Sequence, residues 1–301
     1  MEYNSSKSLI LKLSLIITFV SCSSTHDQPG PNLVEVIASE YKFEAPNEIP
    51  SGWTQFQMSN HGEEEHFLLI TPLAEGVTIE DLQEGGRFLQ ELHNKYDNDE
   101  IKKDEIYEIL NKAFGPPTTD INYNGGPGFL SMGHTVEATT FLDPGRYAIE
   151  CYIRTPQGIQ HNVIGMIQEL VVTEEKSEAT QPSSDHTIVL DNEGIKAEDN
   201  LDTGTYTFEV EFREHPSGYI GNDVHLVRVD EEVTMERIAE WMDVFEKDGL
   251  VSPAPVEFLG GTQERPKGKV AYFTVKLEPG EYAWVAELDY DDKKWKRFTV
   301  H

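Results

Sequence analysis

The chain has 301 residues, a length that accommodates two domains of ordinary size. Its 54 acidic and 24 basic side chains give a formal net charge of −30, which excludes a general nucleic-acid or anionic-membrane surface because both need a positive field. Hydrophobic residues make up 38% of the chain, enough to form buried cores, whereas two cysteines are too few for a disulfide-stapled scaffold.

Residues 1–22 have the pattern of an export signal. Two lysines flank or enter an apolar run at 9–20, which is too short to span a bilayer and is followed by small residues. The end of this segment resembles a bacterial lipoprotein signal in which Cys22 is lipidated, although Phe19 stands where leucine is usual; an ordinary signal peptide is the alternative. The resemblance implies a periplasmic or cell-envelope lipoprotein of the outer membrane that touches the membrane through its anchor alone. Residues 23–32 are expected to be a flexible tether.

The rest of the chain contains two copies of one pattern. Residues 174–185 are rich in Ser, Glu and Thr, lack apolar periodicity, and predict a linker between domains at 33–173 and 186–301. Each copy has a strand after a glycine turn, a histidine entering an apolar strand, a threonine placed to cap a helix, and a Pro-Gly-x-Tyr turn that opens a strand. These segments are 49–60, 63–70, 76–82 and 143–147 in the first copy, and 201–212, 221–229, 232–238 and 278–282 in the second.

The first copy is longer because of an insert at 80–114. Its apolar residues recur near helical spacing, which predicts helices that are broken at Gly85-Gly86 and at 97–99 and that end before Pro116. Short strands with turns at regular spacing and one helical excursion predict an all-β fold of two tandem β-sandwiches, the first with a helical insert.

The run from Cys151 to Met166 carries the candidate chemistry. A strand leads to Cys151, a nine-residue loop leads to His161, and Met166 precedes the next strand. With His66 from an earlier strand, the run supplies two imidazoles, a thiolate and a thioether, which is the ligand set of a blue-copper site. If Cys22 is acylated, Cys151 is the remaining thiol of an exported protein and has no cysteine to pair with.

This order of residues resembles the C-terminal ligand loop of the cupredoxins, the family of blue type 1 copper proteins. The resemblance rests on the Pro-Gly-x-Tyr-x-x-x-Cys approach, the Cys…His…Gly-Met order and the closing strand, and covers the first copy in full and the second in outline. It implies Greek-key sandwiches and one type 1 copper held by His66, Cys151, His161 and Met166, with the methionine as the axial ligand.

Two departures from the family pattern leave other interpretations open. Phe67 stands where the family often has an asparagine after the remote histidine, and the segment between His66 and Cys151 is longer than in a minimal cupredoxin. Each proposed ligand taken alone also fits a packing role, so a retained but metal-free constellation is one alternative. Zinc bound by two histidines and the cysteine is another, but it leaves Met166 without a role.

The second copy is expected to be degenerate and to lack copper ligands. His225 matches His66, but the position of the cysteine falls near Ala286, and no histidine or methionine follows at the loop positions. Its tryptophans at 241, 284 and 295 are expected to lie mainly in the core.

Other residues that could carry chemistry are interpreted as structural. His61 and His134 are expected to be solvated, His93 to lie on an exposed helix face, and the acidic runs at 63–65 and 289–292 to be solvated edges rather than calcium sites. The sequence contains no GxxxxGK[ST], GxGxxG or HExxH motif.

The sequence therefore predicts an exported type 1 copper protein that carries single electrons in the bacterial envelope and is not an enzyme. Its expected partner is a redox protein of unknown identity, with His161 near the loop tip as the exit edge, and no nucleic acid is involved. A metal-free cupredoxin-like binding or assembly lipoprotein, which would use the helical insert and the second domain, is the alternative. Copper storage or delivery is a further alternative.

Overall fold

The structure is a computed structural model that describes residues 32–229, 233–287 and 295–301. The predicted signal, the lipidation of Cys22, the tether up to residue 31 and the acidic run at 289–292 lie outside the described residues. None of the helices in the described ranges has the length and apolar character needed to cross a membrane.

The first half of the chain is a β-sandwich in which β3 (Glu48–Asn60) takes part in both layers. Burial alternates along most of β3, as the sequence predicts, because successive side chains of a strand point to opposite faces. β3 pairs in parallel with β1 and antiparallel with β5, while its first residues pair with β7 of the other layer. The other strands of this half are β1 (Asn32–Ser39), β2 (Lys42–Glu44), β4 (Leu69–Pro72), β5 (Thr135–Leu142), β6 (Gly145–Glu150) and β7 (Ile167–Lys176).

The second half repeats most of these pairings with β11 (Gly204–Phe212) in the place of β3, except that β10 and not β11 pairs with the last strand of the other layer. β11 pairs in parallel with β8 and antiparallel with β14. β12 pairs with β15 as β4 does with β6, and β15 pairs with β16 as β6 does with β7. The other elements are β8 (His186–Asp191), β9 (Gly194–Lys196), β10 (Asn200–Leu201), β12 (Val224–Arg228), α4 (Met235–Met242), β13 (Glu257–Thr262), β14 (Val270–Leu277), β15 (Gly280–Val285) and β16 (Trp295–Val300). The expected all-β fold of two tandem sandwiches is confirmed.

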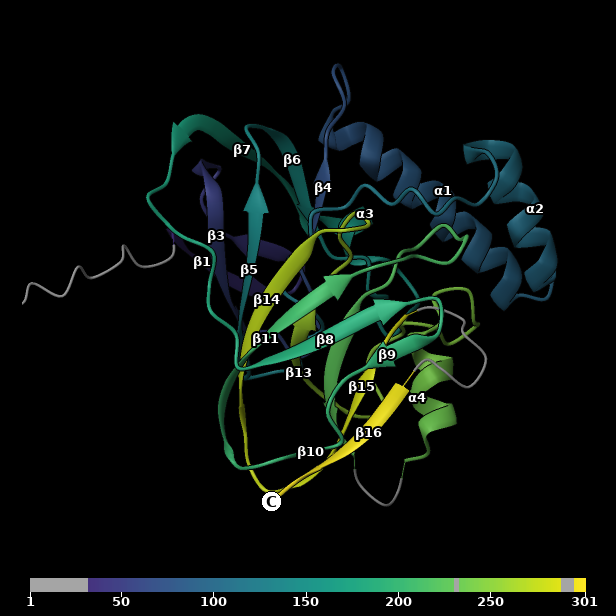
Figure 1. Cartoon of the computed structure of the whole chain (residues 1–301). Helices are drawn as coiled ribbons and strands as arrows, with labels where there is room; N and C mark the ends of the chain where they lie inside the picture. Colours follow the sequence, from purple (N-terminus) through teal and green to yellow (C-terminus); the bar gives the residue numbers. More distant parts are fainter. Residues whose placement is uncertain (1–31, 230–232, 288–294) are drawn as a thin grey trace, which may run out of the picture.

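The two sandwiches share one continuous sheet. Residues 137–139 of β5 pair antiparallel with residues 272–274 of β14, which joins the layers of both halves into an 11-stranded sheet (Figure 1). One hydrophobic cluster likewise contains Phe67 and Phe129 from the first half and Trp241 and Phe258 from the second. The halves are therefore packed as one body over this interface.

The helical insert of the first half is confirmed as two helices, α1 (Ile79–Asp97) and α2 (Lys103–Phe114), which project beside the first sandwich (Figure 1). Thr78 caps α1 as expected: its side chain accepts from the N–H of Asp81, which bonds back to the N–H of Thr78. We call α1, α2 and the residues between them the arm.

The predicted break at Gly85-Gly86 is wrong, because α1 continues through both glycines. A Cβ on Gly86 would lie 3.2 Å from Val163 and 3.3 Å from Oδ1 of Asn162, so this glycine allows the helix to approach the loop after Cys151. A mid-helix glycine costs about 1 kcal/mol in helix propensity, which the close packing of α1 outweighs.

A tyrosine at the same place in each half fixes the turn before the strand. The Tyr147 hydroxyl donates to the carbonyl of Asp143 (2.8 Å), and the Tyr282 hydroxyl donates to that of Glu278 (2.9 Å). The repeat seen in the sequence thus extends to individual hydrogen bonds.

Replacing either tyrosine with phenylalanine removes this bond and leaves the ring in place. We expect Tyr147→Phe and Tyr282→Phe each to lower the free energy of unfolding by about 1 kcal/mol, the net value of such a bond. Denaturant titration of both variants against the unchanged protein measures the loss. Equal stability of all three proteins would contradict the role given to the two turns.

Candidate metal centre

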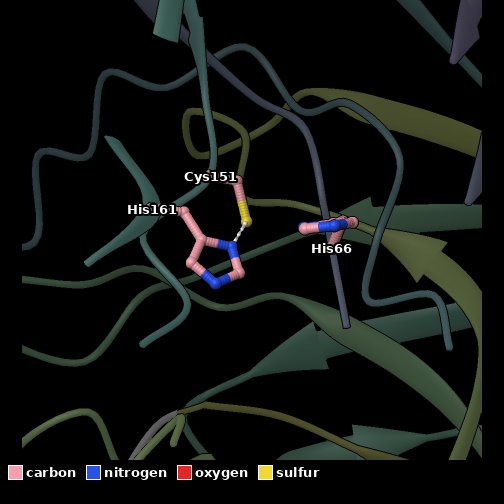
Figure 2. Close-up of side chains that lie close together, drawn as sticks. All are labelled: His66, Cys151 and His161. Atoms are coloured by element: carbon pink, nitrogen blue, oxygen red, sulfur yellow. Dashed lines mark hydrogen bonds between the residues drawn. The ribbon is translucent and has the colours of Figure 1, made fainter. Parts of the chain in front are cut away.

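Three of the four predicted ligands meet inside the first sandwich. One ligand atom from each of His66, Cys151 and His161 can be chosen so that all three lie within 4.8 Å of one another, and all three residues are buried (Figure 2). Sγ of Cys151 lies 3.7 Å from Nδ1 of His161, and the centroids of the two imidazoles are 5.0 Å apart. These atoms come from segments far apart in the sequence, so the fold itself assembles the site.

His66 is held by its main chain just before β4. Its N–H donates to the carbonyl of Leu130 (3.1 Å), and the N–H of Leu130 donates back (2.8 Å). Gly62 lies against the imidazole, since a Cβ at that position would come within 2.8 Å of Nε2. Asn60 fixes the intervening turn by donating to the carbonyls of Glu64 and Leu130 and accepting from the N–H of Gly62.

Cys151 lies just beyond the end of β6 and is tied to Met166. Its N–H donates to the carbonyl of Met166 (3.1 Å), and the N–H of Met166 donates to the carbonyl of His161 (2.9 Å). The N–H groups of Phe67 and Ile153 are directed at Sγ and favour the thiolate, but burial outweighs them and raises the pKa of Cys151 to about 12. Met166 is fully buried, and its role as the axial ligand stays a prediction.

His161 begins the one-turn helix α3 (His161–Ile164) and is enclosed by two side chains. Nε2 lies 2.8 Å from Oε2 of Glu64, and the Tyr41 ring lies 4.8 Å from the imidazole. Because a carboxylate only accepts, Nε2 carries the proton and Nδ1 keeps its lone pair beside Sγ. The side chain of His161 is 0% exposed, and its predicted role as the exit edge for electrons stays a prediction.

The acidic run at 63–65 is only partly the solvated edge that the sequence suggested. Glu63 is exposed, but Glu64 faces His161, and Glu65 is buried and accepts from the Ser252 hydroxyl (2.5 Å). The Tyr41 hydroxyl also donates to Oε1 of Glu64 (3.0 Å), so both carboxylate oxygens of Glu64 are engaged. Two of the three acids are thus part of the interior around the site.

Both nitrogens of His66 are available to a metal ion. Neither Nδ1 nor Nε2 has a hydrogen-bond partner among the described residues, although both are buried. An unsatisfied buried polar group costs about 1–3 kcal/mol, so such groups need an explanation. Burial and the nearby His161 lower the pKa of His66 to about 3, which keeps the imidazole neutral and able to ligate.

The matching histidine of the second half has the opposite environment. Nδ1 of His225 accepts from the N–H of Phe129 (3.1 Å), and Nε2 lies 2.7 Å from Oδ2 of Asp223. Asp223 also accepts from the N–H of Glu287 (3.0 Å). Asp223, His225 and Glu287 could hold a metal by their spacing, but the imidazole of His225 is already satisfied on both nitrogens. The contrast favours the first half as the metal-binding half.

The donor set of the first site suits copper. A thiolate and two imidazoles match the preferences of Cu(I) and Cu(II) together, and the buried Met166 is tied to Cys151 and His161 through its main chain. Zinc would also accept two histidines and a cysteine, but it has no use for a buried thioether. The fit of copper thus depends on donor types and on the unpartnered nitrogens of His66.

The arm holds the loop that carries His161. The side-chain amide of Gln90 donates to the carbonyl of Gly158 (2.6 Å) and accepts from the N–H of Gln160 (2.7 Å). Gln83 donates to the carbonyl of Asn162 (3.0 Å), and the buried guanidinium of Arg154 bonds Asp97. The loop therefore keeps its shape through contacts with α1 on one side and the sandwich on the other.

A group of buried carboxyls lies between the two halves, next to Tyr152. The Tyr152 hydroxyl donates to Glu287 (3.2 Å), and burial followed by the charge of Asp223 raises the pKa of Glu287. Burial and the same aspartate raise the pKa of Glu264 to about 8. This interface therefore contains acids that are costly to ionise.

Several of these residues could not be identified from the sequence as functional. Glu64 lies in an acidic run of ordinary appearance, Tyr41 in a short strand connection, and Glu264 beyond a glycine pair. The expectation that His93 lies on an exposed face is wrong, because its side chain is buried. The predictions for His61, which is exposed, and for the buried Trp241 agree with the structure.

Comparison with known proteins gives structural similarities only, since no family model and no curated protein matches this chain. Auracyanin from Roseiflexus castenholzii is 17% identical over 48% of this chain and 99% of its own, with a TM-score of 0.29. Auracyanin A from Chloroflexus aurantiacus, described as a "blue" copper protein, is 16% identical over 48% of this chain and all of its own, with a TM-score of 0.29. A multicopper oxidase is 9% identical over 89% of this chain and 88% of its own, with a TM-score of 0.23.

Replacing Glu64 with glutamine tests its part in the site. The neutral amide accepts more weakly from Nε2 of His161, so we expect Cu(II) to bind about 10- to 100-fold more weakly. Competition with a chelator of known affinity measures the change. Glu63→Gln is the matched control, because it removes an exposed charge one residue away and should leave the affinity unchanged. Equal weakening by both variants would contradict a specific role for Glu64.

Replacing Glu264 with glutamine tests the cost of the buried carboxyls. The pKa of Glu264 is raised on folding, so the folded state binds more protons than the unfolded state between about pH 4.5 and pH 8, and stability falls as the pH rises through that window. The limiting slope for one group is about 1.4 kcal/mol per pH unit. We expect Glu264→Gln to be more stable than the unchanged protein at pH 8 and to lose that advantage near pH 4.5. Denaturant titrations at the two pH values measure it, and an equal difference at both would contradict it.

Proposed function

We propose that the protein binds one type 1 copper and carries single electrons in the bacterial envelope. The observation that carries this proposal is the meeting of His66, Cys151 and His161 in a buried site where both nitrogens of His66 lack a partner. The ligand types are those of a blue-copper site, and Met166 is tied through its main chain to both Cys151 and His161.

Copper bound there would supply a reversible one-electron change between Cu(I) and Cu(II). His66, Cys151, His161 and Met166 would hold it. The main-chain bonds at each ligand and the packed interior hold the side chains in place, so that they move little when the charge of the site changes. Glu64 keeps the proton of His161 on Nε2, which leaves Nδ1 free to bind.

The route for the electron passes through the side chains of Tyr41 and Glu64, which cover the imidazole of His161. Tyr41 and Glu64 lie between this imidazole and solvent, and Glu64 has a side-chain exposure of 13%. Glu40, Glu63 and Glu64 give this cover a negative surface, and the whole chain is strongly acidic. We infer that the redox partner presents a basic surface that docks over Tyr41.

A carrier is favoured over an enzyme because the ligand residues are buried. Cys151, His66 and His161 are each 0% exposed, which leaves a substrate no open path to the site among the described residues. Copper storage or delivery would use the same donors, and it differs by needing affinity without reversible redox change. The lipoprotein anchor and the location at the outer membrane rest on the sequence of residues 1–22.

A visible absorption spectrum after addition of Cu(II) and removal of the excess tests the proposal. We expect one copper per chain and an intense thiolate-to-copper charge-transfer band. Cys151→Ser should abolish the band, because the thiolate is its source. Cys22→Ser is the matched control: it removes the other cysteine of the chain and should leave the band unchanged.

Two results would overturn parts of the proposal. If the folded protein takes up no stoichiometric copper, the proposed copper site is wrong and the sandwich is a scaffold without a metal. Stoichiometric copper that cannot be reduced and reoxidised in cycles would favour storage or delivery over electron transfer.

A further inference from the structure

A cavity of about 380 Å³ lies between the arm and both halves of the chain. Its lining includes residues of α1 and α2, the loop around His161, and Glu264 of the second half. This volume lies in the range of sites that bind small molecules. None of the ligand residues of the metal centre lines it, so the cavity is a separate feature.

Residues that line this cavity carry unpartnered hydrogen-bond acceptors. Both carboxylate oxygens of Glu264 and Oδ1 of Asn162 are buried without a partner among the described residues. The orientation of the Asn162 amide is fixed, because its Nδ2 donates to the carboxylate of Glu150 (3.0 Å). Oε1 of Gln160 and Nδ1 of His93 are two more unpartnered atoms of the lining.

Glu264 is the member that most needs a partner. It is 1% exposed, and the N–H groups of Glu264 and Gly221 lie near its carboxylate without completing a hydrogen bond. The carboxylate of Glu150 has two donors already, Asn162 and the Thr71 hydroxyl (3.0 Å). A buried carboxylate without donors is costly, which calls for a donor that the cavity admits.

Much of the rest of the lining is apolar, and one glycine of α1 leaves the cavity open. Gly85 lines the cavity, and a Cβ built there would meet nothing within 4 Å. A glycine inside a helix costs stability, so its presence where space is open is consistent with a cavity that must stay clear. The apolar side chains of the lining include Leu82, Leu89, Leu110, Phe114 and Phe245.

We propose that this cavity binds a small organic cation, a primary amine with an aryl or alkyl body. The apolar side chains of the arm pack on the body, and the ammonium group donates to Glu264 and Asn162. An ammonium group has three donors and no acceptor, which matches unpartnered acceptors. An anion would face the carboxylates of Glu150 and Glu264, so the cavity selects against it.

Isothermal titration of the purified protein with phenethylamine, without added metal, tests the proposal. At about pH 8 this amine is protonated, as a lysine side chain is. We expect binding of one amine per chain, at least about tenfold tighter than that of phenethyl alcohol, its neutral isostere, since the charge-assisted bond is missing in the alcohol. Phenylacetate should not bind.

Two variants locate the site. Glu264→Gln should weaken amine binding about 10- to 100-fold and leave the binding of the alcohol unchanged. Gly85→Leu should fill the cavity and abolish the binding of both. Glu84→Gln is the matched control, because it removes an exposed carboxylate of the same helix. Circular dichroism and thermal unfolding establish that each variant is folded.

Several outcomes would overturn the proposal. It is overturned if the protein binds the amine and the alcohol equally well, or if Glu264→Gln binds the amine as tightly as the unchanged protein does. It is also overturned if the folded protein binds no amine from methylamine to phenethylamine. If calcium displaces the amine one for one, and if calcium binding is lost in Glu264→Gln, the ligand of the cavity is a metal ion and not an organic cation. Copper binding by the same sample is measured separately, so a failure here is distinct from a failure of the proposed electron carrier.

Discussion

The antiparallel pairing of β5 with β14 is the constraint on which the metal centre depends. It sets the second sandwich against the segment before β5, where Leu130 forms a bridge with Leu259 and Ser131 donates to the carbonyl of Phe258 (3.0 Å). Leu130 is also the main-chain partner of His66. His66 is therefore positioned by a segment that the second half holds, which gives the second half a structural part in the candidate site.

The two matching histidines have different surroundings in the same fold. His225 has a carboxylate on one nitrogen and a main-chain N–H on the other, and such a network is stable without a metal. His66 has neither, and a cysteine sulfur stands among its buried neighbours. The difference comes from a few side chains around equivalent strands, because β12 pairs with β15 in the second half as β4 pairs with β6 in the first.

The sequence was sufficient for features that follow from local order and periodicity. The tandem repeat, the caps at Thr78 and Thr234 and the two helices of the insert all have local signals, and the structure contains them. The pairing of Glu64 with His161 had no such signal, because it joins residues 97 positions apart. The path of α1 through Gly85-Gly86 depends on what the helix packs against, and no propensity scale contains that information.

Because α1 is attached to the loop that carries His161, this loop cannot be moved into another protein by itself. The carbonyls of Gly158 and Asn162 and the N–H of Gln160 obtain hydrogen bonds from Gln83 and Gln90. A loop transplanted into another sandwich without α1 would lose all three bonds and the anchor of Arg154 at Asp97. The smallest transferable unit is therefore the loop together with its helix, and shortening the chain to a bare sandwich would leave these polar groups unsatisfied.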